Sequence, residues 1–253
     1  MKRFVRGAFR TVGLDIVRYR PQTPGPAFPR DVAPADRAIL ERIAGFTMTD
    51  LERQIVLVQS IRHLVRHRIN GCIVECGVWR GGSSMAAALT LLDEGDTGRD
   101  LYLYDTFEGM PPPKDVDRTP DGTSAQAYLD RDPGKTGDVW AVAAFDDVRR
   151  NMASTGYPDE CVRYVKGPIE STLPDQAPPS PIALLRLDTD WYASTKHELE
   201  CLFPLLAPGG ILIADDYGHW EGARKAVDEY FAGLGQPYFL HRIDYSGRLV
   251  VKA

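Results

Sequence analysis

Residues 72–84 read CIVECGVWRGGSS, and this stretch decides the fold class. The run CIVEC is apolar and partly β-branched, which predicts a short buried strand. Gly77, Gly81 and Gly82 follow in a glycine-rich turn, which lets the backbone bend sharply into a helix. A strand, a glycine-rich turn and a helix in this order begin a β-α-β crossover, so the sequence predicts a parallel sheet.

Six further strand-like runs follow, with helical patterns between most of them. They are LYLYDTF (101–107), CVRYVKG (161–167), IALLRLD (182–188), GILIADDY (210–217), PYFLHRI (237–243) and RLVVKA (248–253). Strands that alternate with helices predict a sheet covered on both faces. Only a short turn, Asp244 to Gly247, joins the last two runs, so these should pair as an antiparallel hairpin. We therefore predict an α/β fold of the Rossmann-like class I methyltransferase type, with a seven-stranded, mostly parallel sheet that ends in this hairpin.

The chain before the sheet has two parts of different character. Residues 1–20 combine six basic residues with interspersed apolar ones, and the proline-rich residues 21–34 resist helix formation. From 36 to 67 the apolar residues recur at helical spacing, and Thr49 is the expected N-cap of the helix that begins DLERQ. We assign residues 1–35 to a basic arm with its linker and residues 36–70 to an N-terminal helical layer.

Residues 71–253 form the predicted catalytic domain. About fifty residues separate its second and third strands, with a helical stretch expected near Val139 to Met152. Loops of this length usually cover binding sites. Since this insert follows a strand at the carboxyl edge of the sheet, we predict that residues 108–137 act as a substrate lid.

The bulk composition excludes several classes of protein. The 253 residues carry a net charge of −5, which gives no reason to expect a nucleic-acid partner. No stretch approaches the roughly 20 apolar residues of a membrane span, and the four cysteines form no C-x-x-C pair. We expect a cytoplasmic protein with reduced thiols. The basic arm suggests peripheral contact with the inner membrane surface, an anionic acceptor or a partner subunit of a homo-oligomer.

The turn after the first strand suits a nucleotide-like ligand. Its spacing, E-x-G-x-x-x-G-G, differs from the dinucleotide pattern and suits an amino-acid carboxylate and ammonium better than a pyrophosphate. Thirty positions after Glu75, Asp105 ends the next run, where a carboxylate can accept both hydroxyls of a ribose. Together with the terminal hairpin, these features predict S-adenosylmethionine as the ligand. The residues assigned to bind it are Glu75, Gly77, Trp79, Gly81, Ser83, Asp105 and Thr106.

Four aspartates follow the fourth and fifth sheet runs: Asp188, Asp190, Asp215 and Asp216. Ligands of an open parallel sheet bind outside the carboxyl ends of its strands, so these side chains should converge on the acceptor. Clustered carboxylates repel one another, and Mg²⁺ relieves that repulsion and helps a hydroxyl to lose its proton. We assign Asp188, Asp215 and Asp216 as Mg²⁺ ligands and Asp188 or Asp190 as the general base. Arg186 is expected to face the other side of the sheet.

Five segments resemble, in order and spacing, the macrocin O-methyltransferase family: VECGVWRGGSS, YDTFEGMP, KGPIESTLP, LRLDTDWYAST and PGGILIADDYGHWEGARKAVDEY. The resemblance spans about Met48 to Tyr230. Members of this family methylate sugar hydroxyls of macrolide and aminocoumarin antibiotics. The resemblance implies a Mg²⁺-dependent enzyme that uses S-adenosylmethionine, is often oligomeric and closes a lid over its acceptor. It places Glu75, Gly77 and Asp105 at the cofactor and Asp188, Asp215 and Asp216 at the metal.

The expected function is therefore methylation of a sugar hydroxyl on a glycoside, an oligosaccharide or a lipid-linked glycan. The alternative is methylation of a catechol-like phenol, because a metal there also binds two adjacent oxygens. A regulatory domain that only binds the cofactor would leave the four aspartates without a role.

Overall fold

The computed structural model describes residues 28–135 and 138–253. The chain divides into two units, Met1–Ala33 and Pro34–Ala253, and all elements named below belong to the second unit. The basic arm predicted at residues 1–20 lies outside the described residues. Among the described helices, none has both the length and the apolar character that a membrane span requires.

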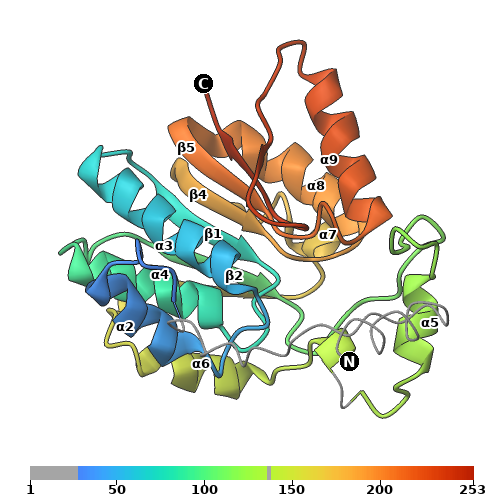
Figure 1. Cartoon of the computed structure of the whole chain (residues 1–253), viewed down its shortest axis with the longest axis horizontal. Helices are drawn as coiled ribbons and strands as arrows, with labels where there is room; N and C mark the ends of the chain where they lie inside the picture. The colour runs from blue at the N-terminus through green and yellow to red at the C-terminus, as the bar shows by residue number, and fades with distance from the viewer. Residues whose placement is uncertain (1–27, 136–137) are drawn as a thin grey trace, which may run out of the picture. The chain divides into compact units, whose positions relative to one another are not determined.

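The described residues form one sheet of seven strands in the order β3-β2-β1-β4-β5-β7-β6 (Figure 1). The strands are β1 (Cys72–Cys76), β2 (Leu101–Asp105), β3 (Val162–Lys166), β4 (Ile182–Leu187), β5 (Leu206–Ala214), β6 (His241–Arg242) and β7 (Arg248–Val251). Strands β1 to β5 pair in parallel, whereas β7 is antiparallel to both β5 and β6. The predicted α/β fold with its C-terminal hairpin is confirmed.

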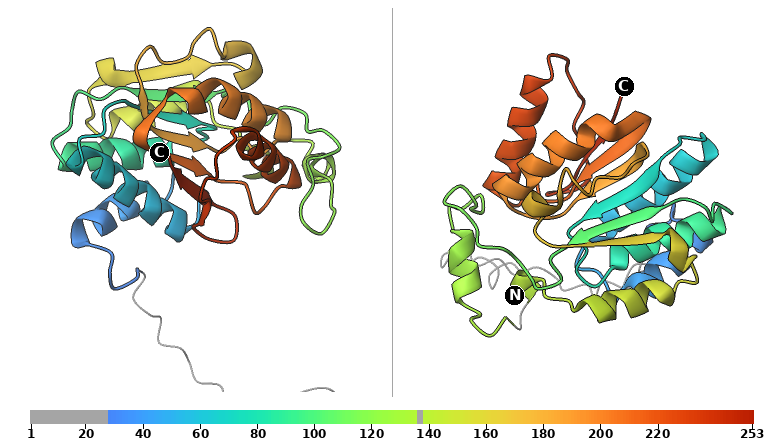
Figure 2. Two further views of the ribbon diagram at one scale, coloured as in Figure 1. Left: turned by 90° about the horizontal axis from the view of Figure 1, so that it is seen from above. Right: turned by 180° about the vertical axis from the view of Figure 1, so that it is seen from behind.

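Helices cover both faces of this sheet. They are α2 (Pro34–Ile43), α3 (Leu51–Arg66), α4 (Gly82–Asp93), α5 (Ala125–Asp130), α6 (Phe145–Ala153), α7 (Ile169–Thr172), α8 (Tyr192–Leu202) and α9 (Glu221–Gly233), with short 3₁₀ turns η1 (Asp138–Trp140), η2 (Asp159–Cys161) and η3 (Phe203–Leu205). Helices α2, α3, α4 and α6 lie on one side of the sheet, and α8 and α9 lie on the other (Figures 1 and 2). Every residue of β1 and of β4 is buried, as expected for central strands between two helical layers.

Three local predictions need correction. The N-cap of α3 is Asp50, whereas the hydroxyl of Thr49 accepts a 3.0 Å hydrogen bond from Arg186. The helix expected from Val139 to Met152 begins only at Phe145, since residues 138–140 form a separate 3₁₀ turn and the N-cap residue Ala144 is extended. Only two residues of the run PYFLHRI pair as a strand, since it lies at the open edge of the sheet with a single neighbour.

Of the insert between β2 and β3, the helix α6 belongs to one helical layer, whereas the part that contains α5 stands apart from both layers. In Figures 1 and 2 its helix α5 lies beyond the carboxyl ends of the strands, on the side toward which β1 and β4 point. This position brings the insert to the edge where ligands of parallel sheets bind.

Candidate active site

A cavity of about 430 Å³ lies at the carboxyl ends of the central strands. Pockets that hold small ligands measure roughly 300–1,000 Å³. The walls come from the ends of β1, β2, β4 and β5, from residues 46–49 before α3, and from both ends of the insert. Of the predicted cofactor residues, those that line the cavity are Glu75, Gly77, Trp79, Ser83, Asp105 and Thr106.

The glycine-rich turn forms one end of the cavity. Gly77 has φ +83°, and a Cβ atom there would lie 1.9 Å from the carbonyl oxygen of Asp188, so only glycine fits between the ends of β1 and β4. Gly81 is the N-cap of α4 with φ +89°. The next amide, that of Gly82, donates to the carbonyl of Phe46 at 2.9 Å. The carbonyl of Phe46, in the segment before α3, therefore occupies one of the free amides at the N-terminus of α4.

Asp105 is held in place by the turn that it faces. Its carboxylate accepts hydrogen bonds from the backbone amides of Val78 (2.7 Å), Trp79 (3.1 Å) and Phe107 (2.7 Å). Burial raises the pKa of this carboxyl, and these amide donors oppose the rise. An ionised carboxylate has about four acceptor positions, so these bonds leave room for one further donor. The adjacent Thr106 donates to the carbonyl of Gly109 at 2.8 Å, which fixes the start of the insert.

Glu75 lies beneath the turn and is almost inaccessible to solvent. It forms a 2.6 Å ion pair with Arg186 and accepts a hydrogen bond from Ser84. Burial raises the pKa of Glu75, while the Arg186 guanidinium opposes that rise. The pairing leaves Glu75 as a structural anchor of the cofactor turn.

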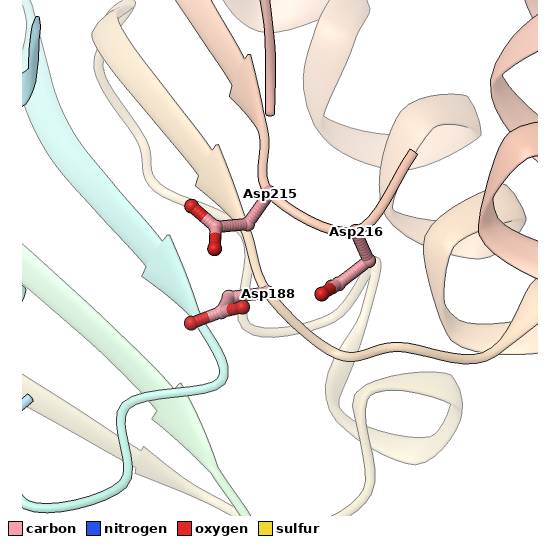
Figure 3. Close-up of side chains that lie close together, drawn as sticks. All are labelled: Asp188, Asp215 and Asp216. Carbon is pink, nitrogen blue, oxygen red and sulfur yellow. The ribbon is translucent and has the colours of Figure 1, made fainter. Parts of the chain in front are cut away.

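The aspartates gather at the ends of two neighbouring strands. Asp188, Asp215 and Asp216 each offer an oxygen, and these oxygens lie within 4.8 Å of one another (Figure 3). Burial raises the pKa of Asp188 and of Asp216, and neighbouring carboxylates act in the same direction. Such a set of carboxylate oxygens has the chemistry of a hard-cation site.

Asp190 faces the same cavity but belongs to a different set of contacts. Its backbone is in the left-handed region at φ +64°, and its amide donates to Asp216 at 3.1 Å. The indole Nε1 of Trp220 donates to its carboxylate at 2.8 Å. Burial, followed by the nearby Asp188, raises the pKa of Asp190.

Two arginines complete the site. The guanidinium of Arg186 lies 2.8 Å from Asp188 and 2.9 Å from Asp215, so the expectation that it faces the other side of the sheet is wrong. Residues two apart on a strand share a face, so the alternation of side chains would have placed Arg186 with Asp188 from the sequence. Arg53 of α3 also pairs with Asp215 and reaches Asp244 at 2.9 Å. In the sequence, Arg53 lies at helical spacing with apolar residues such as Leu57, and a charged residue on a buried helix face indicates a buried acidic partner.

Aromatic side chains at the starts of α8 and α9 and on α5 also line the cavity. The rings of Trp191 and Trp220 meet edge to face with centroids 5.0 Å apart, and Tyr128 of α5 packs on Trp220 at 6.0 Å. His219 contacts the same Trp220 ring, and burial lowers its pKa. These residues give the cavity an aromatic lining beside the imidazole of His219.

Comparison with known proteins agrees with this geometry. Residues 33–251 match the family model described as Macrocin-O-methyltransferase (TylF). The chain is 37% identical over 201 residues to the 8-demethyl-8-(2,3-dimethoxy-alpha-L-rhamnosyl)-tetracenomycin-C 4'-O-methyltransferase of Streptomyces olivaceus, covering 79% of this chain and 73% of that protein. It is 33% identical to the mycinamicin III 3''-O-methyltransferase of Micromonospora griseorubida, covering 73% and 69% of the two chains.

Among solved structures, the O-methyltransferase NovP superposes with a TM-score of 0.69 at 33% identity, covering 82% of each chain. The family match spans the sheet, the glycine-rich turn and the aspartate cluster together. The chain therefore belongs to the macrocin O-methyltransferase family and is an O-methyltransferase with S-adenosylmethionine as its methyl donor.

Proposed function

We propose that this enzyme transfers the methyl group of S-adenosylmethionine to a sugar hydroxyl of a glycosylated natural product, with Mg²⁺ at the aspartate cluster. The observation that carries the proposal is one cavity with a glycine-rich turn at one end and four aspartates beside it. The relatives named above act, by their names, on a rhamnosyl-tetracenomycin and on mycinamicin III, which supports a sugar acceptor. The aromatic side chains that line the cavity suit a sugar face, since rings pack against its C–H groups.

The donor set fits Mg²⁺. Asp188, Asp215 and Asp216 would hold the ion through carboxylate oxygens. Among the described residues, the guanidinium groups of Arg53 and Arg186 pair with this acidic site, which has more carboxyl groups than guanidinium groups and so leaves negative charge for a cation. When bound, Mg²⁺ would favour loss of the hydroxyl proton and fix the oxygen for attack.

For the cofactor we propose the residues assigned from the sequence: Glu75, Gly77, Trp79, Gly81, Ser83, Asp105 and Thr106. Asp105 would accept one ribose hydroxyl rather than both, because three backbone amides already occupy its oxygens. Glu75 would act indirectly, by fixing the end of β1 through its pair with Arg186.

In the transfer, a bond forms between the acceptor oxygen and the methyl carbon while the bond from sulfur to that carbon breaks. The hydroxyl proton passes to a carboxylate, and we propose Asp190 rather than Asp188. Asp188 is engaged by Arg186 and belongs to the cation set, whereas the carboxylate of Asp190 is oriented by Trp220.

Residues 108–137 are proposed as the wall and lid over the acceptor, because Gly109, Met110, Pro111 and Tyr128 line the cavity. The segment boundaries at residues 35 and 70, the membrane contact of the arm and a homo-oligomeric state remain predictions.

Methyl transfer from S-adenosylmethionine to a panel of glycosides and catechols tests the proposal, with Mg²⁺ and with EDTA. We expect glycoside methylation that EDTA abolishes. Asp190→Asn should lower kcat at least 100-fold with Mg²⁺ and cofactor affinities retained, because the proton acceptor is lost. Asp188→Asn should weaken Mg²⁺ binding itself, as followed by calorimetry.

Asp175→Asn is the matched control, because Asp175 is exposed and does not line the cavity. Methylation of catechols but not of glycosides would overturn the sugar acceptor. Full turnover in EDTA would overturn the role of the metal.

A further inference from the structure

Two helices that carry the active site lack caps of their own. The residues at the N-cap positions of α8 and α9 are Trp191 and Trp220, and neither makes a side-chain cap hydrogen bond. An indole only donates hydrogen bonds, so it cannot accept from the free amides of a helix start. Both indoles instead line the cavity and contact each other.

The insert supplies the missing acceptors. The carboxylate of Asp117 accepts from the amide of Tyr192, the first residue of α8, at 2.8 Å. The carbonyl oxygen of Arg118, the next residue along, accepts from the amide of Glu221, the first residue of α9, at 2.8 Å. One dipeptide of the insert therefore caps both helices, and the negative charge of Asp117 lies at a helix N-terminus, where it is favoured.

We call the contacts of Asp117 and Arg118 with the starts of α8 and α9 the joint, and its atoms are closely packed. Asp117 is completely buried, although the insert around it is largely exposed. Its second carboxylate oxygen accepts from the amide of Lys114 at 2.7 Å, and its carbonyl accepts from Ala125 at 2.9 Å. A Cβ atom at Gly222 of α9 would lie 2.0 Å from the Asp117 carboxylate, so the second residue of that helix must be glycine for the joint to close.

Each capped helix follows directly on an aspartate loop. The amide of Trp191 donates to the carbonyl of Thr189, between Asp188 and Asp190, at 2.7 Å. The amide of Trp220 donates to the carbonyl of Asp216 at 3.0 Å. A shift of either helix start would therefore move an aspartate loop, and a displacement of about 1 Å in a reacting site can cost about 100-fold in rate.

We propose that Asp117 is a positioning residue for methyl transfer, which fixes the insert to the starts of α8 and α9 and thereby sets the two aspartate loops and their tryptophans. The segment around Asp117 is then fixed to the two helices, and it holds in place the flanking residues Pro111 and Tyr128, which line the cavity. This inference rests on the proposed function for its catalytic consequence. The capping geometry itself stands independently.

Hydrogen exchange followed by mass spectrometry, together with steady-state kinetics, tests this role. In Asp117→Ala we expect several-fold faster exchange in peptides covering 112–125, 189–195 and 218–224, with exchange in β1 and α4 unchanged. With methyl α-L-rhamnopyranoside as the acceptor probe, kcat should fall roughly 10- to 100-fold. The affinity for S-adenosylhomocysteine, measured by calorimetry, should stay within about twofold, since the cofactor turn is untouched. Asp115→Asn, an exposed position in the same insert, is the matched control and should change neither measurement.

A double-mutant cycle separates this joint from a general loss of stability. Gly222→Ala should reproduce the Asp117→Ala exchange pattern because its methyl group displaces the carboxylate. In the Asp117→Ala background the same change should add less than it does in the wild type, since, of its nearest contacts, only the 3.1 Å contact with the amide nitrogen of Tyr192 then remains. Asp117→Asn, which keeps one acceptor oxygen, should restore part of the protection and serves if the alanine variant does not fold.

Unchanged exchange at Tyr192 and Glu221 in both Asp117 variants would overturn the inference, as would effects of Asp117→Ala and Gly222→Ala that simply add. If the wild-type enzyme does not methylate the rhamnoside, that acceptor of the proposed function fails, and the exchange measurements still decide the role of Asp117.

Discussion

The guanidinium of Arg186 faces Glu75, Asp188 and Asp215 at 2.6, 2.8 and 2.9 Å. Its side chain is only 4% exposed, so solvent does not screen these pairs. Removing one partner of a buried ion pair typically costs about 3–5 kcal/mol, because the remaining charges stay uncompensated in the interior. At the residue scale, Arg186 joins the cofactor turn to the aspartate cluster.

Arg186→Met should therefore lower the free energy of unfolding by about 3–5 kcal/mol, measured by urea denaturation at neutral pH. Arg163→Met is a suitable control, because Arg163 on β3 is half exposed and its pair with Asp100 is long, at 3.5 Å. We expect the control to change stability by less than about 0.5 kcal/mol. Equal losses in the two variants would contradict the structural role of Arg186.

Glu198 of α8 makes stability depend on pH. It is fully buried, and one of its oxygens has no hydrogen-bond partner among residues 28–135 and 138–253, whereas the other accepts from Thr189 at 3.1 Å. Burial raises its pKa from 4.5 to about 8. The folded state therefore binds a proton that the unfolded state releases between these values, and stability from this group is lost as pH rises from 4.5 through 8.

Glu198→Gln removes this titration. The variant should gain stability relative to the wild type as pH rises from 5 to 9, by a few kcal/mol, since each pKa unit is worth about 1.4 kcal/mol. Chemical denaturation at several pH values measures the difference. The exposed Glu200 on the same helix provides the control variant Glu200→Gln, which should leave the pH slope of the wild type intact. A constant difference between Glu198→Gln and wild type across this range would refute the assignment.

At the scale of elements, the ends of β1 and β4 approach each other through the glycine-rich turn. The amide of Asp188 donates to the carbonyl of Cys76 at 2.9 Å, and Gly77 lies against the carbonyl of Asp188. The cofactor turn and the aspartate loop are therefore in direct backbone contact at the ends of β1 and β4. The absence of a side chain at Gly77 is what allows this approach.

Gly77→Ala should disturb both strand ends at once. The added methyl group meets backbone 1.9 Å away at a φ of +83°, so we expect a loss of more than about 2 kcal/mol in stability, and weaker cofactor binding. Gly95→Ala provides the comparison, because Gly95 also has positive φ but no atom of the described residues lies within 4 Å of the added methyl group. Thermal denaturation and calorimetry with S-adenosylhomocysteine measure both effects. A Gly77 variant no worse than the Gly95 variant would show that the close contact does not matter.

At the scale of the whole catalytic unit, Arg53 joins parts of the chain that are distant in sequence. From α3 it pairs with Asp215 after β5 and with Asp244 in the turn between β6 and β7. The N-terminal helices and the C-terminal hairpin are therefore coupled through the aspartate cluster. A cation that binds this cluster should stabilise the whole unit.

Mg²⁺ should raise the melting temperature of the enzyme, and EDTA should reverse the rise. A ligand at 100 times its dissociation constant adds about 2.7 kcal/mol to stability when it binds only the folded state. Differential scanning fluorimetry at increasing Mg²⁺ concentration measures the shift. Asp216→Asn should abolish the response, because it removes one ligand of the cluster. A response of equal size in Asp216→Asn would place the ion elsewhere.

Much of this protein follows from local sequence patterns. The alternation of short β-branched runs with helical segments determines the parallel sheet, because each pattern can bury its apolar face in only one kind of element. The glycine spacing determines the turn after β1, and the short link before β7 determines the hairpin. The aspartates could also be grouped from sequence, since the carboxyl ends of parallel strands meet at one edge.

Only the tertiary structure decided which partners these residues meet. Arg53 and Asp215 are 162 positions apart, and the caps that Asp117 and Arg118 give to α8 and α9 cross 75 residues or more. Periodicity states which face of an element is buried but not which side chain of another element lies against it. The physical reason is that a buried charge or a free helix amide must find a partner somewhere, and folding, rather than local pattern, brings that partner within reach.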